Sequence, residues 1–146
     1  MRSDPYQGCN FTIEIEGLLV GGFSECSGLE VETELVEYHE GGVNDYVHRF
    51  AGRTRSAPLV LRRGITVADG LWRWYQMTAA GQVVRRNGTI FLLEGAYGAG
   101  LHWNFKEAFP YKWTGPDLRA DASSVAFESI ELSHRGLALA GKRPQL

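Results

Sequence analysis

The chain has 146 residues, of which 44% are apolar and 22% charged, and this composition is typical of one folded domain with its own core. Its 15 Lys and Arg oppose 17 Asp and Glu, and a net charge of -2 is too small to supply the positive field that nucleic-acid binding normally requires. The composition therefore excludes a disordered chain and disfavours a DNA- or RNA-binding protein. The near-neutral charge also permits copies of the chain to associate.

Neither a targeting segment nor a disulfide framework is predicted. No apolar stretch approaches the roughly 20 residues that a bilayer crossing requires, so we expect no signal peptide and no membrane anchor. Cys9 and Cys26 are too few for a disulfide framework and predict a protein with reduced thiols inside the cell. No linker or internal repeat divides the sequence, so we predict a single domain over residues 1–146.

Residues 11–16 alternate between apolar and polar side chains, which predicts a strand buried on one face. Gly17 follows and predicts a turn. If that turn is made by residues 16 and 17, Ile15 faces Leu18 and Ile13 faces Val20 across a hairpin.

The segment 29–35 also alternates, and it predicts a strand with Glu30, Glu32 and Glu34 in a row on one side. From residue 39 to residue 56 the alternation is lost among glycines, cations and a few aromatic residues, so we predict a long loop. Loops of this length inside a small domain are uncommon and usually functional, which makes this loop a candidate site.

The rest of the chain predicts one helix and further strands. Residues 59–61 predict a short buried strand, and Thr66 is the predicted N-cap of a helix whose apolar face runs from Leu71 until Gly81 ends it. Residues 89–93 and 101–109 predict a hairpin. In the last strand the apolar residues change parity near Ser129, which predicts a bulge there.

Together these elements predict the fold class. Several strands with a single helix favour a mainly β protein, a small antiparallel β-barrel or sandwich with one α-helix and a long loop. Closing the sheet on itself would remove exposed strand edges.

Motifs of enzymes and metal proteins do not occur in the chain. The segment Gly22-Phe23-Ser24-Glu25-Cys26 lacks the final glycine of a nucleophile elbow, and no glycine-rich phosphate-binding loop is present. The four histidines are isolated from one another, without the spacing that holds zinc. We therefore predict no enzymatic activity and no catalytic, cofactor-binding or metal-binding residues.

Three kinds of residue have both a functional and a structural interpretation. Cys26 could be a nucleophile, but nothing near it in the sequence lowers its pKa, so a buried thiol is favoured. The row Glu30, Glu32 and Glu34 could serve acid–base chemistry or a cation, although such rows are usually solvated strand faces. The tryptophans could stack on bases or sugars, but without a basic groove their packing in the core or in an interface is favoured.

A small β-barrel enzyme or ligand-binding protein is the alternative function from a different class of protein.

Several segments, in order along nearly the whole chain, resemble the T4-type tail tube family of contractile phage tails and phage-derived injection systems. They are Asp4-Pro5-Tyr6, Phe11-Thr12-Ile13-Glu14-Ile15-Glu16-Gly17, Gly22-Phe23-Ser24-Glu25-Cys26-Ser27-Gly28-Leu29, Glu37-Tyr38-His39-Glu40-Gly41-Gly42, Leu61-Arg62-Arg63-Gly64-Ile65-Thr66, Leu71-Trp72-Arg73-Trp74, Trp103-Asn104-Phe105, Ala108-Phe109-Pro110, Gly115-Pro116-Asp117-Leu118 and Glu128-Ser129-Ile130-Glu131-Leu132-Ser133-His134-Arg135-Gly136-Leu137.

This resemblance implies a structural subunit of the inner tube of a contractile phage tail or a phage-tail-like contractile injection system. Six copies would form a ring, and stacked rings would enclose a lumen that conducts a protein or DNA cargo. The implied partners are further copies of the chain, a sheath protein and baseplate or hub proteins. The subunit would be made in the bacterial cytoplasm and assembled into a phage tail or a tail-like particle. A baseplate-proximal paralogue that initiates the tube is the alternative within the family.

Within that framework, two sets of residues are candidate sites. The mixed charges of the long loop are suited to set the register between stacked rings, and this inter-ring set comprises Gly41, Gly42, Asn44, Asp45, Arg49, Arg53 and Arg55. A row of carboxylates would repel DNA from a lumen wall, and this lumen-lining set comprises Glu30, Glu32 and Glu34.

Overall fold

Nine strands and one helix make up the part of the protein that the structure, a computed structural model, describes: residues 11–18, 22–39, 47–92, 101–121 and 125–140. In chain order they are β1 (Phe11–Ile15), β2 (Glu25–Ser27), β3 (Val31–His39), β4 (Val47–Ser56), β5 (Leu59–Gly64), α1 (Gly70–Ala79), β6 (Arg86–Leu92), β7 (His102–Thr114), β8 (Phe127–Ser133) and β9 (Gly136–Ala140). The predicted mainly β fold with one helix is confirmed, and every strand pair is antiparallel.

Strand β7 is the centre of a seven-stranded sheet with the order β1-β6-β7-β8-β5-β2, in which β9 also pairs with β7. The first half of β7 pairs with β6 and β9, and the second half pairs with β8. Between the halves, Glu107 has a φ of 55°. Its backbone N–H donates to Asn87 Oδ1 at 3.0 Å, and its carbonyl accepts from Arg85 at 3.1 Å. These hydrogen bonds stabilise the irregular backbone at Glu107, where β7 passes from one half of the sheet to the other.

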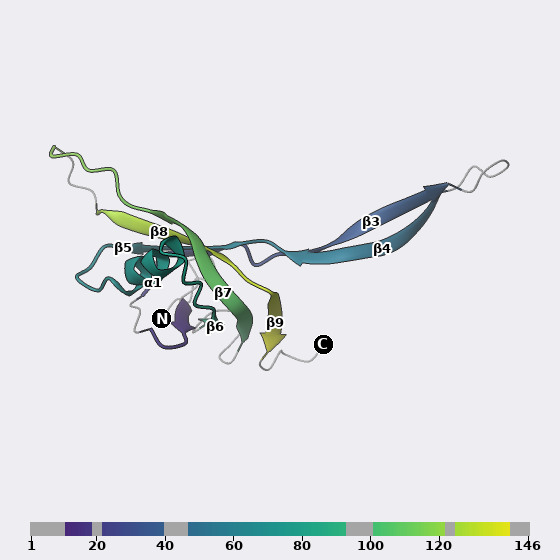
Figure 1. The fold of residues 1–146 in the computed structure, drawn as a ribbon, viewed down its shortest axis with the longest axis horizontal. Helices are drawn as coiled ribbons and strands as arrows, with labels where there is room; N and C mark the ends of the chain where they lie inside the picture. Colours follow the sequence, from purple (N-terminus) through teal and green to yellow (C-terminus); the bar gives the residue numbers. More distant parts are fainter. Residues whose placement is uncertain (1–10, 19–21, 40–46, 93–100, 122–124, 141–146) are drawn as a thin grey trace, which may run out of the picture.

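The sheet curls around β7, so its two halves enclose one core (Figure 1). Helix α1 packs on β7 and adds Leu71 and Trp74 to the core. The Trp74 indole N–H donates to the Val84 carbonyl at 2.8 Å, which satisfies its polar atom. The buried apolar residues of the core are Ile13, Ile15, Phe23, Leu59, Leu61, Leu71, Trp74, Ile90, Phe105, Ala108, Ile130 and Leu132.

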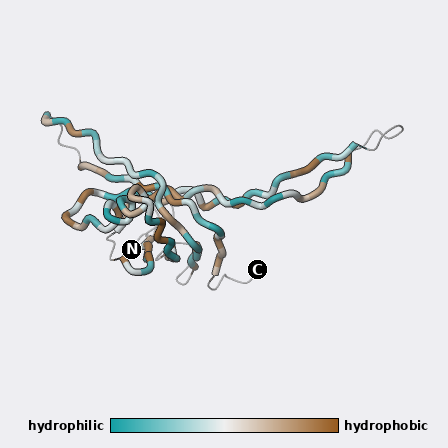
Figure 2. The backbone as a smooth tube through the Cα atoms, viewed as in Figure 1, coloured by the Kyte–Doolittle hydropathy of each residue, from teal (hydrophilic) through white to brown (hydrophobic). Residues whose placement is uncertain are grey.

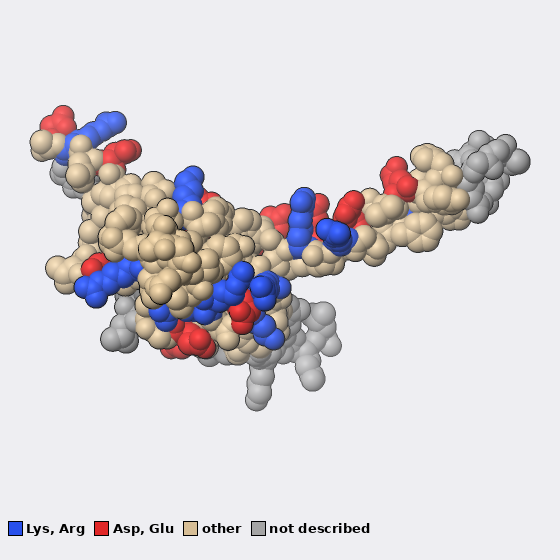
Figure 3. Space-filling view, in the orientation of Figure 1, with Lys and Arg blue, Asp and Glu red and all other residues tan. Residues whose placement is uncertain are grey.

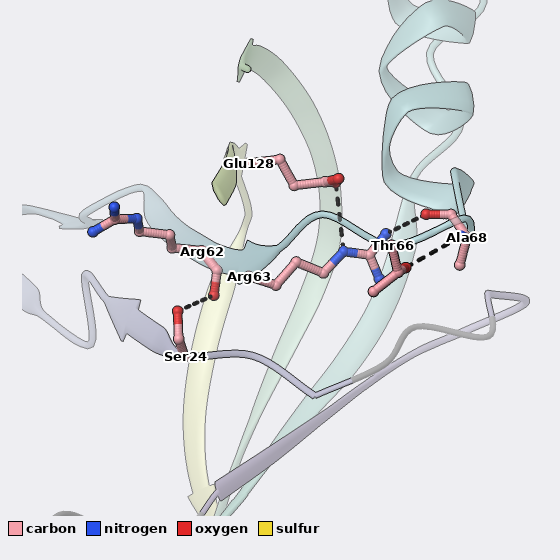
Figure 4. Close-up of polar contacts among 6 residues, drawn as sticks. All are labelled: Ser24, Arg62, Arg63, Thr66, Ala68 and Glu128. Carbon is pink, nitrogen blue, oxygen red and sulfur yellow. Dashed lines mark hydrogen bonds and ion pairs between the residues drawn. The ribbon is translucent and has the colours of Figure 1, made fainter. Parts of the chain in front are cut away.

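A buried ion pair joins β5 to β8 inside this core (Figure 4). Arg63 and Glu128 are 1% and 5% exposed, and Arg63 Nε lies 3.5 Å from Glu128 Oε1. The Arg63 guanidinium also donates to the Ala68 carbonyl at 3.0 Å, in the turn that leads to α1. The pair therefore ties two strands to the start of the helix, and an unpaired charge at this depth would be strongly unfavourable.

Several sequence predictions are confirmed by the strand pairing. Strands β6 and β7 form the predicted hairpin. Ile15 and Leu18 form an isolated bridge, as the turn at Gly17 predicted. On its other edge, β1 pairs with β6. The predicted pairing of Ile13 with Val20 falls on a residue outside the described ranges.

Three predictions are corrected. The helix N-cap is Asp69, and Thr66 instead accepts a hydrogen bond from the Ala68 N–H at 3.1 Å. The buried face of β8 does not change at Ser129, because Glu128, Ile130 and Leu132 are buried on one face along the whole strand. Glu128 can occupy this face because Arg63 neutralises its charge. Residues 47–56 of the predicted loop form strand β4, which pairs with β3.

We predict that Glu128→Gln lowers the free energy of unfolding by about 3 to 5 kcal/mol, because it leaves the Arg63 charge buried without a partner. Urea unfolding followed by tryptophan fluorescence measures the change. Arg63→Met combined with Glu128→Leu removes both charges and should lose less stability than Glu128→Gln alone. The exposed ion pair of Lys112 with Glu131 provides the control, and Glu131→Gln should cost less than about 1 kcal/mol. A double variant as unstable as Glu128→Gln would contradict the prediction.

Candidate functional site

Strands β3 and β4 form a two-stranded arm that projects from the body of the protein (Figure 1). Every residue of β3 is exposed, as is nearly every residue of β4. Five of the exposed side chains are large and apolar, namely Val31, Leu35, Val36, Tyr38 and Phe50. A two-stranded ribbon is at best marginally stable in water by itself, and exposed apolar residues grouped on it mark an interaction surface.

Residues that pair across the arm lie on the same face, and successive residues alternate between faces. The register shifts between Thr33 and Leu35, where Gly52 and Arg53 both lie opposite Glu34. A side chain at Gly52 would approach Val36 Cγ2 to 3.0 Å, so glycine suits the bulge. The bulge increases the local twist and marks the boundary between the inner and the outer half of the arm.

One face of the outer half is aromatic. Val36 pairs with Phe50 and Tyr38 pairs with His48, and the rings of His48 and Phe50 stack with centroids 6.5 Å apart. We call these four residues the aromatic face. Tyr38 and Phe50 remain 54% and 55% exposed, so about half of each side chain is open to a partner. Figure 2 shows hydrophobic segments along the arm at a distance from the core.

The inner half of the arm carries opposite charges on that same side. Glu32 and Arg55 pair across the strands, with 3.8 Å between their charged groups. On the opposite side of the arm, Thr33 and Thr54 share a hydrogen bond of 2.8 Å, and Arg49 Nε donates to Glu37 at 3.4 Å. In Figure 3 the charged side chains gather mainly toward the body, and uncharged ones cover much of the outer arm. The arm therefore combines a charged base with a less polar outer half.

The root of the arm, residues 28–30 and 57–58, depends on Gly28. Strands β2 and β5 pair in the body, and the same two chain segments continue outward as β3 and β4. Gly28 has a φ of 97°, and a Cβ at this position would collide with the Pro58 carbonyl oxygen. The next turn is held by hydrogen bonds from the Glu30 N–H to the Gly28 carbonyl at 2.7 Å and from the Ala57 N–H to the Glu30 carbonyl at 3.0 Å. This kink directs the arm away from the sheet.

His134 supports the root from the junction of β8 and β9. Its Nε2 lies 3.1 Å from the Ala57 carbonyl oxygen, and its Nδ1 lies 3.2 Å from the Gly136 carbonyl oxygen. Both neighbours accept hydrogen bonds, so a ring N–H can donate to either of them. The imidazole thereby links the base of the arm to the central sheet.

The residues predicted to stack rings are distributed along the arm and its tip. Arg49, Arg53 and Arg55 lie on β4, a strand, where the sequence predicted a loop. Gly41, Gly42, Asn44 and Asp45 lie outside the described residues.

The predicted lumen-lining row is split by the root. Glu32 and Glu34 lie on β3, and Glu30 lies before it. The row is also opposed by cations, because Arg55 faces Glu32 and Arg53 lies at the bulge opposite Glu34. In the sequence, Arg53 and Arg55 fall in the predicted loop, so no cation was predicted opposite the row.

Sequence reasoning missed the aromatic face. Alternation over residues 29–35 predicts the inner part of β3, but it breaks at Leu35 and Val36 and is absent from residues 47–56, because both faces of the arm are exposed and no core keeps one of them apolar. His48 and Phe50 were the available evidence, since aromatic residues are unusual in a solvent-exposed loop.

Cys26 on β2 lies beside the root, partly buried. Burial raises the pKa of the Cys26 thiol to about 11, so the thiol stays protonated at neutral pH. This agrees with the interpretation of Cys26 as a packed thiol and gives no support to a nucleophile.

Metal and membrane sites were also sought in the described part of the chain. Within the five described ranges, no three His, Cys, Asp or Glu side chains come together in an arrangement that could bind a metal ion. Helix α1, the one helix found there, lacks the length and apolar character of a membrane span.

Residues 7–138 match the family described as T4-like virus tail tube protein gp19. The match spans most of the chain, and the chain belongs to this family. None of the curated protein sequences compared with the chain matches it.

Solved structures share the fold. One is a chain in the cryo-EM structure of an extracellular contractile injection system, the PVC sheath–tube complex in its extended state, with 24% identity, coverage of 91% of this chain and 89% of that chain, and a TM-score of 0.79. Another is in the baseplate of the anti-feeding prophage, with 24% identity, coverage of 96% and 98%, and a TM-score of 0.79. Hcp1 from Flavobacterium johnsoniae is more distant, with 15% identity, coverage of 93% and 98%, and a TM-score of 0.54.

We predict that Gly28→Ala lowers the free energy of unfolding by about 1 to 3 kcal/mol, because the root must abandon its left-handed backbone and move away from Pro58. Urea unfolding measures the loss, and limited proteolysis of the arm reports its displacement. Gly136→Ala is the matched control, since a Cβ there meets nothing within 4 Å. Equal stability of the two variants would show that the kink does not require glycine.

Proposed function

We propose that the chain is a structural subunit of the inner tube of a contractile phage tail or a phage-tail-like contractile injection system. Six copies form a ring, and the rings stack around a lumen that conducts cargo. The observation that carries this proposal is the arm: a tail tube fold projects a two-stranded ribbon that carries large, exposed apolar side chains. An assembling subunit requires such a surface, whereas a protein that acts as a monomer gains nothing from it.

In this proposal the whole chain is one domain with a structural role, and it catalyses no reaction. The arm and its tip, including Gly41, Gly42, Asn44, Asp45, Arg49, Arg53 and Arg55, form the inter-ring contact. Opposite charges along β3 and β4 set the register between rings, because mismatched registers would bring like charges together.

The partners of the tube follow from the same proposal. A sheath protein surrounds it, and baseplate or hub proteins meet its end. The similar chains in sheath–tube and baseplate structures support these partners. The subunit is made in the bacterial cytoplasm and is then built into the particle. A baseplate-proximal initiator is the second candidate, because the same fold also occurs in the baseplate of the anti-feeding prophage.

Electron microscopy of the purified chain tests the proposal, and the expected result is six-fold rings or hollow tubes. We predict that Phe50→Asp raises the protein concentration needed for tubes at least tenfold, because a carboxylate on the aromatic face must be buried in the contact. Val83→Asp is the control, since Val83 is an exposed apolar residue of the body. Wild-type chain that remains monomeric at high concentration would contradict the tube. Tubes from Phe50→Asp at the wild-type concentration would contradict the role of the arm.

We also propose that Glu30, Glu32 and Glu34 line the lumen and keep DNA from binding its wall. Glu32 is the least informative residue to change, because it pairs with Arg55 on the arm. Glu30→Lys combined with Glu34→Lys should leave tubes intact and increase the DNA retained in them at low salt, measured by the absorbance ratio of purified tubes. Asp117→Lys, between β7 and β8, is the control for added positive charge. Unchanged retention in the Glu30 and Glu34 variant would refute the lumen assignment.

A further inference from the structure

The two end strands of the curled sheet, β1 and β2, face one another across a groove of about 480 Å³. Within the described ranges, β2 pairs with β5 alone and has an outer edge without a strand partner, whereas the outer edge of β1 carries the bridge between Ile15 and Leu18. The groove is therefore the open side of the sheet, where the core reaches the surface. It is lined by Phe11, Ser24, Glu25, Cys26, Ser27, Leu29, Ile90, Leu92 and Trp103.

The lining of the groove favours an apolar occupant. Phe11 and Trp103 are partly buried side chains that pack against the core and extend it to the groove, which Leu92 also lines. The Cys26 thiol on the other side is uncharged at neutral pH. Glu25 is the one charged residue of the lining, and its carboxylate lies 3.6 Å from Arg62. An apolar side chain would therefore enter without stripping water from an unpaired charge.

The arm of the same copy leads away from this groove. Leu29 lines the groove, and the arm begins two residues later at Val31. Because of the kink at Gly28, the strands then run outward from the body (Figure 1). Val36 lies five residues beyond Val31, which in an extended strand is about 17 Å. The exposed side chains of Val36, Tyr38 and Phe50 are thus carried away from the groove of their own chain, where another copy can reach them.

We propose that the groove between β1 and β2 receives the aromatic face of the arm of a second copy of this chain. The inference rests on the proposed function and adds the acceptor surface for the arm. Val36, Tyr38 and Phe50 are the exposed apolar groups that enter, and the aromatic residues Phe11 and Trp103 of the acceptor are suited to pack against them.

Backbone pairing supports the same arrangement. Strands β3 and β4 pair with each other and, within the described ranges, with no further strand, so each presents an outer edge. The acceptor offers the outer edge of β2 beside the groove. A strand added to this edge would satisfy backbone groups on both copies. Because donor and acceptor are different surfaces of one chain, the contact is head-to-tail and repeats from copy to copy.

Photo-crosslinking tests this proposal in assembled tubes. The photoreactive residue p-benzoylphenylalanine replaces Phe50, and the variant is mixed with an excess of ¹⁵N-labelled wild-type chain before assembly. After illumination, mass spectrometry should find position 50 joined to peptides that contain residues 24–29, 90–92 or 103. Those peptides should carry the ¹⁵N label, which shows that they come from another copy.

The control places the same photoreactive residue at Leu35, which is 68% exposed and lies on the opposite side of the arm. Its yield of groove crosslinks should be at least tenfold lower than that from position 50. Tubes in which position 50 crosslinks elsewhere, or to the groove of its own copy, would overturn the acceptor assignment while leaving the tube itself in place. Wild-type chain that forms neither rings nor tubes would instead overturn the proposed function.

Discussion

A left-handed backbone at Gly28 separates the part of the molecule that buries its own apolar side chains from the part that does not. Before this residue, β2 pairs with β5 and belongs to the curled sheet; beyond it, the same hairpin continues as an arm without a core. The collision that any Cβ would make with the Pro58 carbonyl oxygen gives glycine a direct structural reason at this position. The exposure of the aromatic face is a consequence of this kink.

The body provides a rigid base for that arm. Strand β7 serves both halves of the sheet, and the left-handed Glu107 between them is held by Asn87 and Arg85. The buried pair of Arg63 and Glu128 connects β5 and β8, while His134 connects the arm root to the junction of β8 and β9. A projecting ribbon can position a contact only if its base is fixed. Here the base continues from the paired strands β2 and β5, and His134 supports it.

Assembly of copies is the function that the exposed arm and the groove of the sheet support best. The charged pairs on the arm are exposed and therefore contribute little affinity; in the proposed contact between rings their role is to discriminate between registers. Apolar contact is the larger source of affinity, and the chain carries both an apolar arm and an apolar groove. With a net charge of -2, long-range repulsion does little to oppose the approach of copies. These properties agree with membership of a tail tube family.

The sequence by itself determined the strands with one buried face, the single helix, the hairpin of β6 and β7, and the family. Local periodicity and turn residues are sufficient for these features, because burial on one side leaves a regular pattern. The tertiary structure alone revealed β4, since both of its faces are exposed and its sequence, unlike residues 29–35, has no apolar period. It also showed that Glu128 occupies a core position, because only the partner strand supplies Arg63. The groove likewise joins residues from 11 to 103, whose proximity depends on the curl of the sheet rather than on any local pattern.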